Sequence, residues 1–305
     1  MKTILTSVLV GSLLATLAVA EQPSRVVGRL GFADNAKRRA AQHSAPGAAS
    51  PMVYAITIGF EFGAVDLRSG AFLPIGAGLP PDVGDGLVPG PGKSLLSLGF
   101  TGNLYSIDPF TGQTSLVGAT GLGDCSTPTS PCGPNSALWI GYVDGHYYVT
   151  DFANNLYSLD PKTAATKLIG PTGIPGLTFP PFSENPDGSV NVFGASLFSF
   201  RGKFYAYFAT LSVNFATGTF TPLIPGAIYR IDPATGHATM VAPTETTLSA
   251  IVNVNDTVYA FNGFTGQEVV LDVTNGHTTV VTDVDPEAGV IAGAAPARPA
   301  APVVH

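Results

Sequence analysis

The chain has 305 residues, a formal net charge of −7 at pH 7, and a charged fraction of only 11%, with 36 glycines and 26 prolines. This composition is typical of short buried strands joined by tight turns, and it argues against a chain of long solvated helices. Residues 51–290 hold seven Lys and Arg against nineteen Asp and Glu, a net charge of −12. Such a surface repels phosphate backbones, so nucleic acid is not expected as a partner.

The first twenty residues have the pattern of a secretory signal. One lysine precedes an apolar run, Ile4 to Val19, and Ala18-Val19-Ala20 has the small-x-small form of a cleavage site. The sequence therefore predicts a secreted protein, which would be periplasmic in a Gram-negative host. No later stretch reaches the ~18 continuous apolar residues of a membrane helix, so no membrane span is expected.

Residues 21–50 are rich in Ala, Arg and Ser and contain Lys37-Arg38-Arg39. Two interpretations remain open for this segment. It is either a disordered basic linker or a pro-segment with a dibasic processing site.

A repeated turn sequence begins after this segment. Its clearest copy is Leu104-Tyr105-Ser106-Ile107-Asp108-Pro109-Phe110-Thr111-Gly112, in which residue-by-residue alternation predicts a strand and Asp-Pro-x-Thr-Gly predicts a tight turn. A short apolar strand follows each copy. The copies align on five aspartates, which are Asp66, Asp108, Asp160, Asp232 and Asp272. Their spacing of 42, 52, 72 and 40 residues is that of propeller blades with insertions.

Each repeat unit is predicted to hold four strands, named A to D from the ring centre outward. The first unit begins with its strand B at Val53–Ile58 and therefore lacks a strand A. The last unit is followed by a leftover strand at Ala288–Ala292. Placing the leftover strand beside the first one completes a blade and closes the ring, which removes open sheet edges.

We therefore predict an all-β fold, a five-bladed β-propeller over residues 51–292, closed by a C-terminal innermost strand. Six blades are the alternative, if a long insertion hides an eroded blade. Residues 293–305 are expected to be a disordered Ala/Pro tail.

The two cysteines are Cys125 and Cys132. An even number of cysteines at short spacing in an exported protein predicts one disulfide. A metal site is not expected at these thiols, since no further thiols or histidines lie near them in the sequence.

The strand order separates two faces of the ring. The D–A and B–C connections lie on one face, called the loop face, and the A–B and C–D turns lie on the other, called the turn face. All the long segments fall on the loop face: Ala77–Gly92, Ala119–Ser136, Pro171–Gly194 and Ala209–Gly226. Because long loops on a rigid scaffold often bind ligands, we expect a site at the channel mouth on the loop face.

The loop face carries carboxylates but no histidine, which disfavours a catalytic triad or a His-ligated metal. Two carboxylates could act as acid and base on a glycan, and several could bind Ca²⁺. Solvated Asp and Glu on an acidic protein would give the same pattern, and the repeat aspartates are expected only to form turns. The candidate ligand-binding residues are Asp85, Asp124, Glu184, Asp187 and Glu245.

Gly90-Pro91-Gly92-Lys93-Ser94 imitates the end of a phosphate-binding loop. Leu87 occupies the position where such a loop requires its first glycine, and Pro89 and Pro91 lack the backbone N–H groups that would bind the phosphate. We therefore do not expect a phosphate site there.

The copies of Leu-Tyr-Ser-Ile-Asp-Pro-Phe-Thr-Gly resemble the repeats of secreted β-propeller proteins, broadly the NHL/YVTN-like and quinoprotein-like group, over residues 52–292. The resemblance implies the fold but no activity, because that group includes binders, scaffolds and enzymes. The sequence predicts a monomeric binding protein whose partner is a neutral glycan, a peptide or a cation. The alternative is a carboxylate-dependent hydrolase or lyase acting on an extracellular polymer, which leaves open whether the protein is an enzyme.

Overall fold

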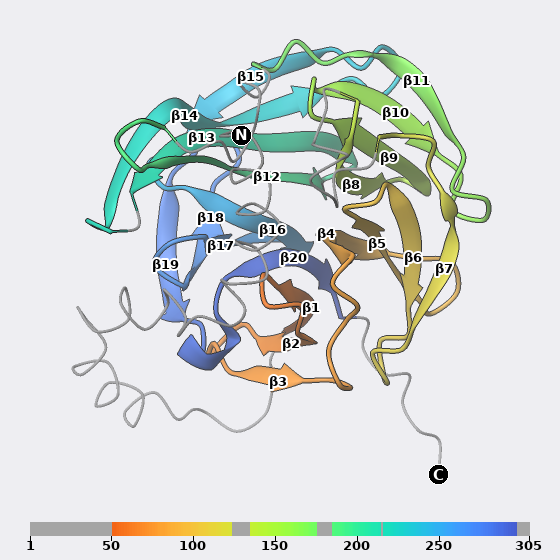
Figure 1. Ribbon diagram of the computed structural model, residues 1–305, viewed down its shortest axis with the longest axis horizontal. Coiled ribbons are helices and arrows are strands. Elements are labelled where there is room, and N and C mark those ends of the chain that lie inside the picture. Colours follow the sequence, from red (N-terminus) through yellow and green to blue (C-terminus); the bar gives the residue numbers. More distant parts are fainter. Residues whose placement is uncertain (1–50, 124–134, 176–184, 215, 298–305) are drawn as a thin grey trace, which may run out of the picture.

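The computed structural model describes residues 51–123, 135–175, 185–214 and 216–297. These residues form twenty strands in five four-stranded sheets, arranged as blades around a centre (Figure 1). β4, β8, β12, β16 and β20 surround the centre, and β3, β7, β11, β15 and β19 lie along the rim. None of the described helices is long and apolar enough to cross a membrane.

Each blade is an antiparallel meander from strand A to strand D. In that order, blade 1 consists of β20 (Ile291–Pro296), β1 (Met52–Thr57), β2 (Phe62–Asp66) and β3 (Phe72–Pro74); blade 2 of β4 (Val83–Pro89), β5 (Leu95–Gly99), β6 (Asn103–Ile107) and β7 (Thr114–Ala119); and blade 3 of β8 (Ala137–Val143), β9 (His146–Asp151), β10 (Asn155–Leu159) and β11 (Thr166–Pro171). Blade 4 consists of β12 (Val190–Phe200), β13 (Lys203–Asn214), β14 (Thr219–Ile231) and β15 (Ala238–Pro243); and blade 5 of β16 (Leu248–Val254), β17 (Thr257–Asn262), β18 (Gln267–Leu271) and β19 (Thr278–Asp283).

The ring closes where the last strand joins the first. β20 pairs antiparallel with β1, with Val53 opposite Pro296 and Ile56 opposite Gly293. The innermost strands of all five blades contact their neighbours around the ring, which leaves no room for another blade. The five-bladed fold and its closure by a C-terminal strand are confirmed, and the six-bladed alternative is wrong.

The closing strand lies later in the chain than predicted. β20 spans Ile291–Pro296, whereas Pro286–Ala288 forms a short 3-10 helix, so the strand predicted at Ala288–Ala292 is misplaced and the predicted tail from Gly293 begins too early. The small side chains that suggested disorder instead suit the crowded centre of the ring. A β-carbon on Gly293 would lie 2.9 Å from the carbonyl carbon of Gly86 on β4.

Five hydrophobic clusters hold the blades together, one between each adjacent pair. Between blades 5 and 1, which we call the closing interface, Val252 and Phe261 of blade 5 pack with Val53, Val65 and Leu67 of blade 1. Burying one such aliphatic or aromatic side chain contributes about 1.5–3 kcal/mol. A single blade would expose two apolar faces, so its stability depends on the neighbouring blades.

The repeat aspartates form the C–D turns, as predicted. Oδ1 of Asp108 accepts the N–H groups of Phe110 at 2.8 Å and Thr111 at 3.0 Å. The other four copies accept equivalent donors. Since N–H and hydroxyl donors stabilise the charged form, they lower the pKa of the carboxyls of Asp108, Asp160, Asp232 and Asp272.

Each C–D turn packs against the end of strand D in the preceding blade. A β-carbon on Gly276 would collide with the carbonyl oxygen of Pro243 at the end of β15, and one on Gly70 would collide with that of Asp283 at the end of β19. Both glycines have positive φ, 75° and 71°. Glycine therefore serves this turn twice, by adopting the left-handed conformation and by allowing the close approach.

We predict that Gly293→Ala lowers the free energy of unfolding by about 1–3 kcal/mol, because the new methyl group meets backbone that cannot move aside. Urea unfolding followed by the fluorescence of the buried Trp139 measures the change. Gly59→Ala is the matched control, since its β-carbon would meet only Thr57 Oγ1, at 3.5 Å, and we expect a change within about 0.5 kcal/mol. Equal losses in the two variants would contradict the crowded packing of β20.

We also predict that the turn aspartates make the fold sensitive to acid. Their folded-state pKa values lie below the ordinary 3.8, so the stability they contribute is present above pH 3.8 and is lost as the pH falls through the folded values. Asparagine keeps an oxygen that accepts the same N–H groups without titrating. A variant with Asp108→Asn, Asp160→Asn, Asp232→Asn and Asp272→Asn should therefore show a smaller fall in urea midpoint between pH 5 and pH 2. An unchanged fall would mean that other groups cause the acid sensitivity.

Candidate functional site

The predicted loop-face residues are only partly described. Asp85 lies within β4, where it pairs with Leu98 of β5, so it belongs to the innermost strand of blade 2 and not to a loop. Asp124 and Glu184 lie outside the described residues, and so do Cys125 and Cys132 with their predicted disulfide.

Asp187 forms a local turn before β12. Its Oδ1 accepts the N–H of Ser189 at 3.0 Å and the hydroxyl of Ser189 at 2.7 Å, and these two bonds lower the pKa of Asp187. The side-chain amide of Asn214, at the end of β13, donates to the main-chain carbonyl of Asp187 at 3.2 Å. These contacts assign Asp187 to the structure of the turn.

Glu245 lies beside a histidine. Its Oε2 is 3.7 Å from Nδ1 of His277, and both side chains are mostly exposed. Glu245 belongs to the D–A connection after blade 4 and His277 to the C–D turn of blade 5, which meet at the joint between Pro243 and Gly276. The strand order assigns Glu245 to the loop face, which is expected to carry no histidine, whereas the structure brings Glu245 beside His277 of a C–D turn. An exposed pair of this kind is screened by water and contributes little to stability.

The insertion predicted as a loop at Ala209–Gly226 is largely a β-hairpin. β13 and β14 run past the ends of the other blades and pair as far as Asn214 and Thr219. β15 pairs only with Ala227–Ile231, and no other described strand covers the outer edge of Thr219–Gly226. Pro222 and Pro225 lack N–H donors on this stretch, a usual protection for an open edge.

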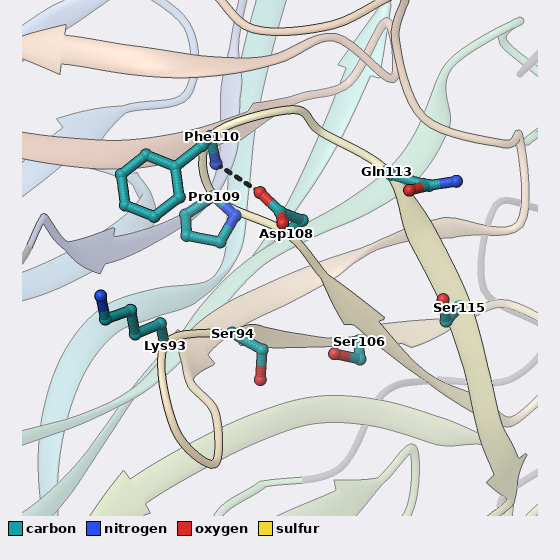
Figure 2. A pocket seen from close by; sticks show the side chains of 8 residues that line it. All are labelled: Lys93, Ser94, Ser106, Asp108, Pro109, Phe110, Gln113 and Ser115. Carbon is teal, nitrogen blue, oxygen red and sulfur yellow. Dashed lines mark hydrogen bonds between the residues drawn. The ribbon is translucent and has the colours of Figure 1, made fainter.

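A hollow of about 460 Å³ lies on the turn face of blade 2. Its walls come from the A–B turn, β6, the C–D turn and β7 (Figure 2). Lys93 and Phe110 lie on one side and Gln113 and Ser115 on the other. The lining residues are Lys93, Ser94, Ser106, Asp108, Pro109, Phe110, Gln113 and Ser115.

The hollow exists because the A–B turn of blade 2 is longer than those of blades 3 to 5, which are Asp144-Gly145, Arg201-Gly202 and Asn255-Asp256. In blade 2 the N–H of Gly90 donates to the carbonyl of Ser94 at 2.8 Å, and the hydroxyl of Ser94 donates to the carbonyl of Pro91 at 2.9 Å. The resulting loop carries Lys93 into solvent beside the C–D turn.

Phe110 is the second departure of blade 2. The third residue of the C–D turn is Arg68, Lys162, Ala234 or Thr274 in the other blades, and only blade 2 has an aromatic ring there. Phe110 is 66% exposed, although the Asp108 carboxylate fixes its backbone N–H. The ring is therefore displayed to solvent from a rigid turn.

The side chains that line the hollow are suited to binding a ligand. It holds one cation, Lys93, and one carboxylate, Asp108, whose Oδ1 already accepts two turn N–H groups. The serine hydroxyls and the Gln113 amide can both donate and accept hydrogen bonds. Among all the described residues, no three His, Cys, Asp or Glu side chains come together as a metal site.

The hollow is not predicted from the sequence, because the A–B and C–D turns are similar in most repeats. Gly90–Ser94 is interpreted only as a possible phosphate loop and Asp108 only as a turn residue. A comparison of the turns between repeats contained the signal, since Lys93 lies in the one lengthened A–B turn and Phe110 at a variable position.

The strand order defines the class of protein, a five-bladed β-propeller built from sequence repeats. No protein-family model and no curated relative matches the chain. Among solved structures it is similar to a chain of a nidogen/laminin complex, with 11% identity and a TM-score of 0.47 over 81% of this chain and 98% of that one.

Two further similar structures are the PQQ-bound aldose sugar dehydrogenase of Streptomyces coelicolor (13% identity, TM-score 0.42, 83% of this chain and 90% of that one) and a putative TolB of Agrobacterium tumefaciens (13%, 0.38, 77% and 89%). Similarities at this level assign no activity, ligand or partner to the chain. The particular function has to be argued from the site.

We predict that Asp108→Ala releases the turn beneath Phe110. The amides of Phe110 and Thr111 should lose hydrogen-exchange protection by about tenfold, because each donates to Oδ1 of Asp108. Asp108→Asn, which keeps the acceptor, should retain protection. The amide of Ala234 in the equivalent turn of blade 4 is the internal control, and its loss of protection in the alanine variant would indicate general destabilisation.

Proposed function

We propose that this chain is an exported binding protein that takes a short neutral glycan in the hollow of blade 2. The observation that carries the proposal is the exposed ring of Phe110 beside a hollow lined by hydroxyl, amide and ammonium groups. The predicted secretory signal in residues 1–20 supports export.

A sugar ring complements this lining. Its hydroxyls donate and accept hydrogen bonds, as do Ser94, Ser115 and Gln113, and its C–H face can cover an aromatic ring. The volume of about 460 Å³ falls in the ~300–1,000 Å³ range of small-ligand pockets. A single exposed aromatic residue is common on protein surfaces, so the proposal depends on the combination of ring and polar lining.

Binding is favoured over hydrolysis in this hollow. A glycosidase needs two carboxyl groups about 5–10 Å apart, and the lining supplies one, Asp108, which the turn already uses. A hydrolase or lyase acting through the loop face stays a prediction, as does Ca²⁺ binding there, since Asp124 and Glu184 lie outside the described residues.

A glycan array followed by calorimetry on the mature protein tests the proposal. Phe110→Ala should weaken binding at least tenfold, equivalent to about 1.4 kcal/mol, and Gln113→Ala should weaken it severalfold. Phe220→Ala is the matched control, since this ring is 38% exposed on the hairpin of blade 4, and it should leave affinity unchanged.

Two outcomes would contradict the proposal. The first is affinity that survives Phe110→Ala. The second is affinity lost on Asp187→Ala or on removal of Ca²⁺, which would move the site to the loop face. A complete absence of glycan binding in the wild-type protein would reject this ligand class.

A further inference from the structure

A carboxyl group lies where the other blades have apolar side chains. Glu268 lies in β18, strand C of blade 5, four residues before the repeat aspartate Asp272. All five residues at this position are at most 1% exposed, and the other four are Phe62, Leu104, Leu156 and Ile228. We call these five equivalent positions the column. Glu268 is its only charged-type residue, and the other four side chains fill the interfaces between blades.

Glu268 lies in the closing interface. It is directly opposite Phe261 on β17, and Phe261 belongs to the cluster that joins blade 5 to Val53 and Val65 of blade 1. The equivalent Leu104, Leu156 and Ile228 likewise pack in clusters toward the following blade. Among the described residues, neither carboxyl oxygen of Glu268 has a hydrogen-bond partner.

The surroundings of Glu268 disfavour its charged form. Burial raises the pKa of Glu268 from 4.5 to about 8, with a further contribution from the Asp66 carboxylate at the end of β2. Burial raises the pKa of the Tyr259 phenol on β17, the nearby Glu268 carboxylate raises it further, and Arg68 lowers it. On β19, Asp283 pairs with Gln267, the neighbour of Glu268.

We propose that closure of the ring between blades 5 and 1 depends on protonation of the buried carboxyl group of Glu268. The neutral carboxyl packs in the interface, and the ionised group requires water and loosens it. Because the folded-state pKa is raised, this contribution to stability is fully present below pH 4.5 and declines as the pH rises toward about 8. The other four interfaces have no carboxyl group at this position, so the sensitivity is confined to the closing interface.

Hydrogen exchange of the whole protein between pH 5 and pH 8 tests the proposal. The exchange rate of each amide is compared with that of the same amide in Glu268→Gln at the same pH, because this ratio cancels the pH dependence of the intrinsic exchange rate. The ratio of wild-type to variant rates in β1, β18 and β20 should rise on the order of a hundredfold over this range. The ratio in β9 and β10 of blade 3 should change far less. Glu61→Gln makes the same chemical change at an exposed site and should show no pH-dependent ratio.

Glu268→Leu restores the apolar residue of the column and provides a second variant if Glu268→Gln folds poorly. Its exchange rates near the closing interface should be as insensitive to pH as those of the glutamine variant. A ratio that stays constant from pH 5 to pH 8 would overturn the proposal. An equal rise in all five blades would also overturn it, because the effect would then be global.

Discussion

The pairing of β20 with β1 is the contact on which the rest of the structure depends. Every blade has two apolar faces, of which one is covered by the preceding blade in the ring and the other by the following blade. An open row of five blades would leave two such faces and the inner edge of β1 exposed to water. One antiparallel strand pair, from Val53–Pro296 to Thr57–Ile291, removes both problems together.

A second set of contacts fixes the blades at the rim. The C–D turn of each blade rests on the last strand of the preceding blade, which explains why the turn sequence recurs: the aspartate folds the turn and the small fifth residue allows the contact. Blade 3 shows how the rule can vary. Its fifth residue is Ala164, with a φ of 63°, and it faces Gly118 of β7. In this blade the glycine that allows the close contact therefore lies on the neighbouring strand instead of in the turn.

The sequence predicted the fold well because the evidence for it was repeated five times. Strand alternation and Asp-Pro-x-Thr-Gly turns are local signals that the sequence shows directly. Counting the strands also showed that the first repeat lacks a strand A and that the last repeat is followed by an extra strand. The bounds of β20 were less accurate, since Gly293 and its small neighbours resemble a disordered tail until the crowding at the ring centre is known. The sequence does not predict the extension of β13 and β14 as a hairpin, because prolines and a glycine interrupt the alternation of β14.

The site was harder to predict because it depends on departures from the repeat. Lys93, Phe110 and Glu268 are ordinary residues in isolation, and each becomes informative only when compared with the same position in the other blades. Glu245 shows the limit of assigning residues to faces from strand order. The rim joint brings a D–A connection beside a C–D turn, and so Glu245 meets His277.

The pairing of β20 with β1 also determines when the fold can be completed. Val53 and Pro296 are partners in one sheet although almost the whole propeller lies between them in the chain. At roughly 5–20 residues per second, a ribosome needs about ten to fifty seconds to make that stretch. Until then β1 presents an unpaired edge, and the β20 of another chain offers it the same hydrogen bonds. The edge of β1 is therefore protected within its own chain only once almost the whole propeller has been synthesised.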